Sequence, residues 1–359
     1  MSSKGVVDAT IHQWTVDLSE MKDLVPERWQ QRLATKSMIQ DPVSGTLMPT
    51  IPWYHAYWNE DAKDYEREDP DQWTNSERYS SPELLEETLA EQGVETAILT
   101  GHEMRFLPAL LNAEYQTAIA SSYNQLLKKR WLADSDRLKG GILVSMSDPE
   151  GAVAEIERYA ADPDMVTVLV YGGHELPLGH HIHHPVYEAA QDAGLPITIH
   201  TSGNPVHRQT AMGLPAYFAT HDINLAQNHM TNAISLVFER VFDMYPDLQI
   251  VWSGQGTEWV LQTKWRSTRY YRNIEEQAPD IDKEPWEYMQ DNFSFTTYPM
   301  GRMDPEHQHS LWRMAGIDNV IYASGYPDWN SDTPTDLPDL PEEDKDKILR
   351  ENAERVYNL

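Results

Sequence analysis

Short apolar runs rich in β-branched residues recur along the chain and are separated by segments with helical spacing. Eight of these runs have the length and pattern of buried strands; they cover residues 6–11, 94–99, 141–144, 166–170, 196–200, 248–252, 293–297 and 320–323. Helices are predicted in most of the gaps, for example at residues 149–161, 185–193 and 231–244. Such regular alternation of strand and helix predicts an α/β fold, a closed parallel (β/α)₈ TIM barrel, with a doubly wound sheet as the alternative.

One long interval interrupts this alternation. It covers residues 13–80, between the first two predicted strands, and includes an aromatic stretch at residues 52–58. A loop of that length in a compact domain is usually a lid or a subunit contact, and in a barrel it leaves from the ligand-binding face. We therefore expect a single domain over residues 1–359, with the insertion 13–80 as a lid. Residues 332–359 are predicted to form a C-terminal loop and a closing helix at 342–356.

Charge and composition exclude several classes of partner. The chain has 57 acidic and 28 basic residues and a net charge of −29, whereas nucleic acids and anionic membranes are bound by Lys and Arg. No apolar run approaches the roughly 18 residues that span a bilayer, and no apolar signal core follows Met1. We expect a cytoplasmic protein without nucleic-acid or membrane partners. The acidic excess indicates a halophilic source, or alternatively an ordinary acidic enzyme.

The chain contains no cysteine, which excludes disulfides, thiolate zinc sites, iron–sulfur clusters and a cysteine nucleophile. Any metal must be held by histidines and carboxylates. A run of four histidines within residues 180–184 directly precedes a predicted helix. That position favours a structural role in the loop that enters the helix.

The candidate chemistry lies where the predicted strands end, because TIM barrels take their catalytic groups from the C-terminal strand ends. The residues at or just beyond these ends are His12, His102, Glu103, His174, Glu175, His200 and Asp328. Glu103 and Glu175 each belong to a Gly-His-Glu string, one after the second strand and one after the fourth. Neutral imidazole is the commonest metal ligand, so the converging histidines predict a metal centre, unless one or more are structural.

Several motifs resemble those of the amidohydrolase-related family, a branch of the amidohydrolase superfamily that includes aminocarboxymuconate-semialdehyde decarboxylase and the resorcylate decarboxylases. The similarity rests on Ser122-Tyr123-Asn124, Asp136-Arg137-Leu138-Lys139-Gly140, Leu195-Pro196-Ile197-Thr198-Ile199-His200, Ser324-Gly325-Tyr326-Pro327 and the closing residues 348–355. It implies a (β/α)₈ barrel, usually oligomeric, with one divalent metal such as Zn²⁺ or Mn²⁺. That metal would activate water for hydrolysis or orient a carboxylate for non-oxidative decarboxylation.

The resemblance also implies where the metal ligands fall, and several of those positions are altered. His12 and His200 are retained, but the other ligand positions hold Thr10, Gly254 and Gly325. Two imidazoles are fewer than the three protein ligands of a catalytic zinc site. The change at Gly325 also removes the carboxylate that would act as the general base.

Three functions therefore remain open. In the first, His12 and His200 hold a metal with new partners, and Asp328 or a Gly-His-Glu carboxylate accepts a proton during hydrolysis or decarboxylation of a small carboxylate, lactone or aromatic acid. In the second, the pocket is a metal-independent acid–base lyase or hydratase. In the third, the chain is a non-catalytic binding protein or the silent subunit of a hetero-oligomer with a paralogue. Either enzyme is expected to be a homo-oligomer.

Overall fold

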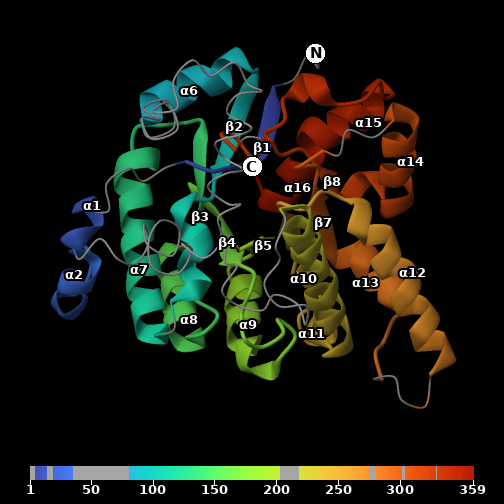
Figure 1. Ribbon diagram of the computed structural model, residues 1–359, viewed down its shortest axis with the longest axis horizontal. Coiled ribbons are helices and arrows are strands. Elements are labelled where there is room, and N and C mark those ends of the chain that lie inside the picture. Colours follow the sequence, from blue (N-terminus) through green and yellow to red (C-terminus); the bar gives the residue numbers. More distant parts are fainter. Residues whose placement is uncertain are drawn as a thin grey trace.

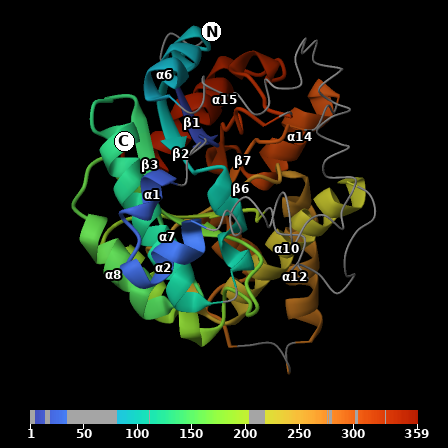
Figure 2. The ribbon, with the colours of Figure 1, turned by 60° about the vertical axis from the view of Figure 1, so that its left-hand side comes forward.

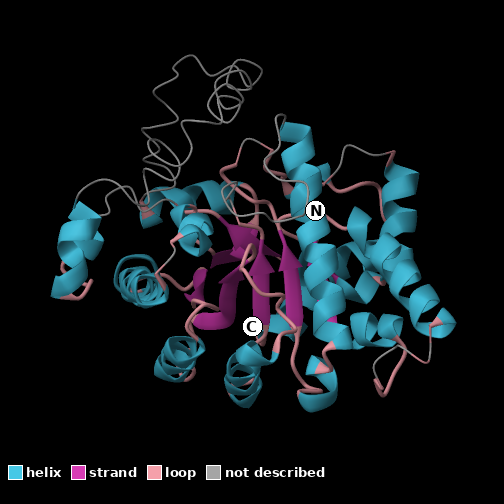
Figure 3. Cartoon of the chain, turned by 60° about the horizontal axis from the view of Figure 1, so that its bottom comes forward, coloured by secondary structure: helices cyan, strands magenta, loops and turns pink. Residues whose placement is uncertain are grey.

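The computed structural model describes residues 5–13, 19–34, 81–110, 112–202, 218–274, 276, 280–300, 304–328 and 330–359. Eight strands form one sheet in chain order, and each strand pairs in parallel with the next. The strands are β1 (Val6–Ile11), β2 (Val94–Leu99), β3 (Leu138–Leu143), β4 (Met165–Tyr171), β5 (Ile197–His200), β6 (Ile250–Ser253), β7 (Phe293–Thr296) and β8 (Val320–Ile321). They lie at the centre, and helices surround them (Figure 3).

Backbone hydrogen bonds join the first and last strands and close the barrel. The amide of Ala9 donates to the carbonyl of Tyr322 at 3.1 Å, and the amide of Gly325 donates to Thr10 at 3.1 Å. The amide of His12 donates to the carbonyl of Tyr326 at 2.8 Å. The predicted (β/α)₈ fold is therefore confirmed, and the segment after β8 lies directly beside the end of β1.

Helices cover the outside of the sheet (Figure 1). They are α6 (Pro82–Glu91), α7 (Ala113–Leu126), α8 (Pro149–Tyr159), α9 (His184–Asp192), α10 (Phe218–Phe238), α11 (Val241–Met244), α12 (Glu258–Asn273), α13 (Pro285–Asn292), α14 (Pro305–Ala315), α15 (Glu342–Asp346) and α16 (Asn352–Tyr357). Shorter 3₁₀ or π segments are η2 (Glu103–Ala109), η3 (Leu127–Leu132), η4 (His181–His183), η5 (Ile317–Asn319), η6 (Pro334–Asp336) and η7 (Lys347–Glu351). Ser81 and Asp148 cap α6 and α8, and a proline follows each cap, as is typical of helix starts.

Two predicted helices differ in their limits. The segment predicted at 231–244 begins earlier, at Phe218, and is interrupted at Arg240, whose φ of 63° is left-handed. A residue in that conformation ends a helix, so α10 and α11 are separate. The closing helix predicted at 342–356 has a π segment, η7, between α15 and α16.

The first part of the insertion forms two short helices on the outer side of the barrel. These are α1 (Ser19–Lys22) and α2 (Glu27–Ala34), which lie beside α7 (Figures 1 and 2). The ring of Trp29 lies 5.0 Å from that of Tyr115 on α7, and Met21 and Val25 are buried. The aromatic residues 52–58 lie outside the described residues, so the lid remains a prediction.

The interior of the barrel is filled by strand residues with inward side chains. Val7, Ala9, Ile98 and Val251 belong to one buried cluster, and Tyr357 of α16 packs into it. The barrel is therefore a packed core, and the chemistry of the fold belongs to the strand ends. In the described part of the chain, no helix is long and apolar enough to cross a membrane.

Candidate active site

Two buried histidines face each other at the carboxyl end of the barrel. His12 directly follows β1 and His200 ends β5; their Nε2 atoms lie 2.8 Å apart and their rings are nearly perpendicular, at 82°. The ring of Tyr171, at the end of β4, lies 5.5 Å from that of His200. Its hydroxyl donates to the carbonyls of Thr100 and Gly101 after β2. The ends of four strands are thus held together around the histidine pair.

The outer nitrogens of the two rings determine where their protons sit. Nδ1 of His200 lies 2.8 Å from the carbonyl oxygen of Thr201, which only accepts hydrogen bonds. Nδ1 of His12 lies 3.2 Å from Oδ2 of Asp328, and an ionised carboxylate also only accepts. These neighbours favour a proton on each Nδ1, although the contact of His12 with Asp328 lacks hydrogen-bond geometry. In that tautomer both Nε2 atoms are acceptors, and a proton or another cation between them would join the two lone pairs at 2.8 Å.

Asp328 is a buried carboxylate shared by several donors. Nη1 of Arg105, from η2, donates to its Oδ2 at 2.7 Å, and the hydroxyl of Tyr298 donates to the same oxygen at 3.0 Å. Burial raises the pKa of Asp328, but the guanidinium of Arg105, together with His12 and His102, holds that pKa well below its usual range. Asp328 is therefore ionised at neutral pH and is a weak base that orients His12.

His102 is held in its neutral form beside the same guanidinium. Its Nδ1 lies 2.6 Å from Nη2 of Arg105 and 3.5 Å from Oδ1 of Asp328. Burial and the charge of Arg105 lower the pKa of His102 to about 3. Burial also lowers the pKa of His12 and, more strongly, that of His200. The cluster therefore carries one fixed cation, Arg105, and one fixed anion, Asp328.

Of the three altered ligand positions, one has a side chain that is engaged in a hydrogen bond, and the other two are glycines without a side chain. The hydroxyl of Thr10 lies 2.7 Å from that of Ser253 and forms a hydrogen bond across the barrel. Gly254 has φ +89°, and a Cβ at this position would lie 3.1 Å from Nε2 of His200. Gly325 has φ +66°, and a Cβ there would lie 2.2 Å from the ring of Tyr298. The Tyr298 ring thus fills the space in which a side chain at residue 325 would begin.

These residues do not fit the family's divalent metal centre. The described part of the chain contains no group of three or more His, Asp or Glu side chains able to hold a metal. Asp328 lies on the Nδ1 side of His12, away from the facing Nε2 atoms. Among the described side chains, two neutral donors, His12 and His200, are directed at a common point, and a third protein ligand is expected for a catalytic site.

The structure brings together four of the seven residues that the sequence singled out. These are His12, His102, His200 and Asp328. His174 is partly buried and Glu175 is exposed, and the β4 residue that contacts His200 is Tyr171. Glu103 begins η2, but its side chain lies outside the described part. The catalytic roles of all these residues remain predictions.

Arg105 and Tyr298 are central to the cluster and were not predicted. Arg105 is a nearly buried cation three residues beyond His102, in a chain where cations are scarce. Tyr298 precedes a proline after β7, as Tyr326 does after β8. This repeated Tyr-Pro pair at adjacent strand ends was the available sequence signal for Tyr298.

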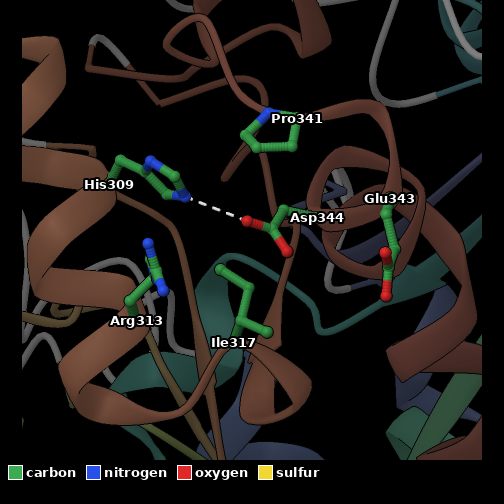
Figure 4. Close-up of a pocket in the computed structure, with 6 residues that line it drawn as sticks. All are labelled: His309, Arg313, Ile317, Pro341, Glu343 and Asp344. Carbon is green, nitrogen blue, oxygen red and sulfur yellow. Dashed lines mark hydrogen bonds and ion pairs between the residues drawn. The ribbon is translucent and has the colours of Figure 1, made fainter.

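A separate cavity of about 410 Å³ lies between α14 and α15 (Figure 4). Its lining residues are His309, Arg313, Ile317, Pro341, Glu343 and Asp344. Ile317 belongs to η5, which precedes β8, whereas the site residues follow their strands. The cavity is therefore at the opposite end of the barrel, and His309 and Arg313 are suitable control positions for variants of the site.

Comparison with known proteins identifies the family. The family model described as amidohydrolase matches residues 7–359, so the chain belongs to this family. The γ-resorcylate decarboxylase of Rhizobium sp. (strain MTP-10005) is 24% identical over 284 residues, which cover 74% of this chain and 84% of that protein. The enzyme of the same name from Polaromonas sp. (strain JS666) is 24% identical over 299 residues, or 77% of this chain and 90% of that protein.

Solved structures show the same fold. An amidohydrolase from Mycobacterium avium subsp. paratuberculosis superposes with a TM-score of 0.75 and 20% identity, covering 99% of this chain and all of that one. A 5-carboxyvanillate decarboxylase from Novosphingobium aromaticivorans, with bound manganese, has a TM-score of 0.74 and 18% identity, covering 99% of this chain and 98% of that one. The resemblance predicted from the sequence motifs is therefore confirmed.

Proposed function

We propose that this protein is a carboxy-lyase that removes CO₂ non-oxidatively from a small aromatic acid. The observation that carries the proposal is the facing pair His12 and His200, oriented by Asp328 at the catalytic face of the barrel. The γ-resorcylate and carboxyvanillate decarboxylases among its relatives supply the reaction class. Their substrates are small aromatic acids, which is the substrate class proposed for this chain.

The reaction needs one proton at a defined carbon. The ring carbon that bears the carboxylate gains a proton, the bond to the carboxyl carbon breaks, and its electron pair returns to the ring as CO₂ leaves. One proton is consumed for each CO₂ released. A proton bound between the Nε2 atoms of His12 and His200 would be donated readily, as by a general acid, because burial lowers the pKa of both rings.

Other side chains of the cluster position the reactants. Asp328, which lies 3.2 Å from Nδ1 of His12, favours a proton on that atom and so directs the lone pair of Nε2 at His200. The rings of Tyr171 and Tyr298 flank the histidines at 5.5 Å and 5.9 Å and provide flat apolar surfaces for an aromatic substrate. Among the described residues, Arg105 is the cation nearest the histidines, and a substrate carboxylate would have to exchange with its contacts to Asp328 or His102.

The state of Asp328 favours a lyase over a hydrolase. Hydrolysis requires a general base whose pKa lies near the working pH. Beside Arg105, the pKa of Asp328 is well below its usual range, so this carboxylate is a poor acceptor for a proton from water. Hydrolysis of a lactone or amide is therefore the weaker proposal for this site.

Two other accounts lead to different results in the test. A Zn²⁺ or Mn²⁺ ion held by His12 and His200 would make the reaction metal-dependent, as expected from the family resemblance. A non-catalytic homologue, whether a binding protein or a silent subunit, would show no turnover. Assembly into a homo-oligomer, or into a hetero-oligomer with a paralogue, is a prediction that light scattering and co-purification would test.

Product analysis tests the proposal. The protein, purified in high KCl, is incubated with 2,6-dihydroxybenzoate and with 5-carboxyvanillate, and CO₂ and the decarboxylated phenol are quantified. We expect turnover that falls by about 10²- to 10⁴-fold in His12→Ala and in His200→Ala, the usual contribution of a positioned acid. His309→Ala should retain the wild-type rate. Absence of CO₂ from aromatic acids, or equal rates in all variants, would refute the proposal.

A further inference from the structure

We propose that this chain has replaced the metal centre of its family with a metal-free site in which the guanidinium of Arg105 provides the positive charge for the substrate carboxylate. The inference rests on the proposed function for the identity of the substrate. Its metal-free part rests on the described side chains alone. It differs from the related structures, three of which hold manganese.

The first observation is that the eighth-strand ligand position is closed to any side chain. A Cβ on Gly325 would lie 2.2 Å from two ring atoms of Tyr298, a separation that real Cβ atoms do not tolerate. Tyr298 is itself fixed, because it is buried and its hydroxyl donates to Asp328 and to Asn330. The local packing is therefore arranged around a residue without a donor at position 325.

The second observation is that no other described residue replaces the lost donors. Gly254 faces Nε2 of His200 and offers only its backbone. Thr10 uses its hydroxyl in the hydrogen bond to Ser253. The ring of His102 lies 6.4 Å from that of His12, and its Nδ1 lies 2.6 Å from the guanidinium of Arg105. Each of these described positions is thus bare or engaged elsewhere.

The third observation is the charge of Arg105 itself. Its side chain is only 12% exposed and lies within hydrogen-bonding distance of both His102 and Asp328. A guanidinium is always charged in proteins and binds carboxylates through parallel N–H donors. Asp328 balances this charge, and the donor nitrogens of Arg105 face Asp328 and His102, so a substrate carboxylate would bind in exchange for one of these contacts. The same charge suits the binding of an aromatic carboxylate.

The metal content of the protein tests the metal-free part of the inference without any measurement of activity. The wild-type protein is dialysed against Mn²⁺ and, separately, Zn²⁺, then passed through a desalting column and analysed by mass spectrometry for metal per chain. We expect far less than one equivalent. The double variant Thr10→Asp/Arg105→Gln, which adds a carboxylate beside His12 and removes the cation, should retain more metal and serves as the positive control. One equivalent in the wild type, lost in His12→Ala but retained in His309→Ala, would overturn the inference.

Binding of an aromatic acid tests the proposed role of Arg105. The dissociation constant of 2,6-dihydroxybenzoate is measured by calorimetry in the presence of a chelator. We expect Arg105→Gln to weaken binding by about 10-fold or more, as for a lost charged hydrogen bond, with partial recovery in Arg105→Lys. Arg313→Gln, an exposed arginine in the distant cavity, should leave binding unchanged. Unchanged affinity in Arg105→Gln, or binding that requires Mn²⁺, would overturn the inference.

The outcomes for this inference and for the proposed function can be separated. A protein without metal that binds the acid through Arg105 but releases no CO₂ would retain the inference and refute the proposed function. Release of CO₂ that depends on a stoichiometric, chelatable metal would retain the proposed function and refute the inference.

Discussion

The ring of Tyr298, which follows β7, fills the space beside Gly325, which follows β8; a Cβ on Gly325 would lie 2.2 Å from it. The two residues therefore depend on each other. Tyr298 can reach Asp328 only because residue 325 has no side chain, and its hydroxyl lies 3.0 Å from Oδ2 of that carboxylate. Position 325, which the family resemblance assigns to a metal ligand, is here part of the packing around Tyr298, whose hydroxyl is hydrogen-bonded.

Adding a methyl group at Gly325 should be much more costly than adding one at a glycine with the same backbone. Gly325 and Gly194 have φ of +66° and +64°, but only Gly194 has open space around its Cα. We expect Gly325→Ala to lose about 1–3 kcal/mol more than Gly194→Ala, the usual cost of overpacking. Urea unfolding measures both. In Gly325→Ala/Tyr298→Ala the excess should disappear, and an unchanged excess would contradict the account.

The ion pair of Asp328 and Arg105 should be far more sensitive to single than to double substitution. Both side chains are nearly buried, so Asp328→Asn leaves an uncompensated cation and should cost about 3–5 kcal/mol. The apolar double variant Arg105→Met/Asp328→Leu should cost less than the sum of the single changes. Additive losses in a double-mutant cycle would show that the pair is not coupled.

The same pair gives a pH dependence with a defined sign. The pKa of Asp328 is lowered in the folded state from 3.8, so its stabilisation is present above that unfolded value and is lost as pH falls through the folded pKa. The difference in melting temperature between wild type and Asp328→Asn should therefore be constant near neutral pH and shrink below about pH 4. A difference that grows in acid would contradict the assigned state.

His229 should make the stability of the protein depend on pH between 6.5 and about 4, a higher range than that of Asp328. It is buried beside Trp252 and Trp259, its Nε2 lies 3.1 Å from the carbonyl of Ser253, and burial lowers its pKa to about 4 from 6.5. The unfolded chain binds the extra proton first, so stability should fall as pH decreases from 6.5 to 4. His229→Gln should flatten this fall by about 1.4 kcal/mol per pH unit. If stability falls equally with pH in the wild type and in His229→Gln, His229 is not the group responsible for the fall.

Salt should stabilise the protein if the acidic surface reflects a halophilic source. The net charge of −29 produces self-repulsion that added ions screen. We expect the melting temperature to rise from low to multimolar KCl. A melting temperature that is independent of KCl would leave an ordinary acidic enzyme as the explanation.

Much of the fold followed from local pattern. The strands at 6–11 and 94–99 have the predicted limits, because β-branched residues bounded by polar ones define buried strands. The limits of α10 and of the closing helix did not follow. Arg240 is left-handed and η7 is a π segment, and local helix propensity predicts neither feature.

The site was most predictable where a residue lies at or just after the end of its strand. His12 directly follows β1 and His200 ends β5, and the geometry of a parallel barrel brings such residues together. His102 and Asp328, in the loops after β2 and β8, were singled out by the same argument and join them. Arg105 comes from a 3₁₀ segment after β2, and no periodicity directs a side chain from such a segment. The pairing of Tyr298 with Gly325 depends on two loops meeting in space, which one sequence does not reveal.

The reaction itself is tested most directly by decarboxylation in D₂O. The protein is incubated with 2,6-dihydroxybenzoate in deuterated buffer, and the product is examined by NMR and mass spectrometry. The account predicts a phenol with one deuterium at the carbon that lost CO₂, formed by the wild type and His309→Ala but only weakly by His12→Ala. Unlabelled product, no product, or fragments that carry oxygen from water would contradict the proposal of a carboxy-lyase.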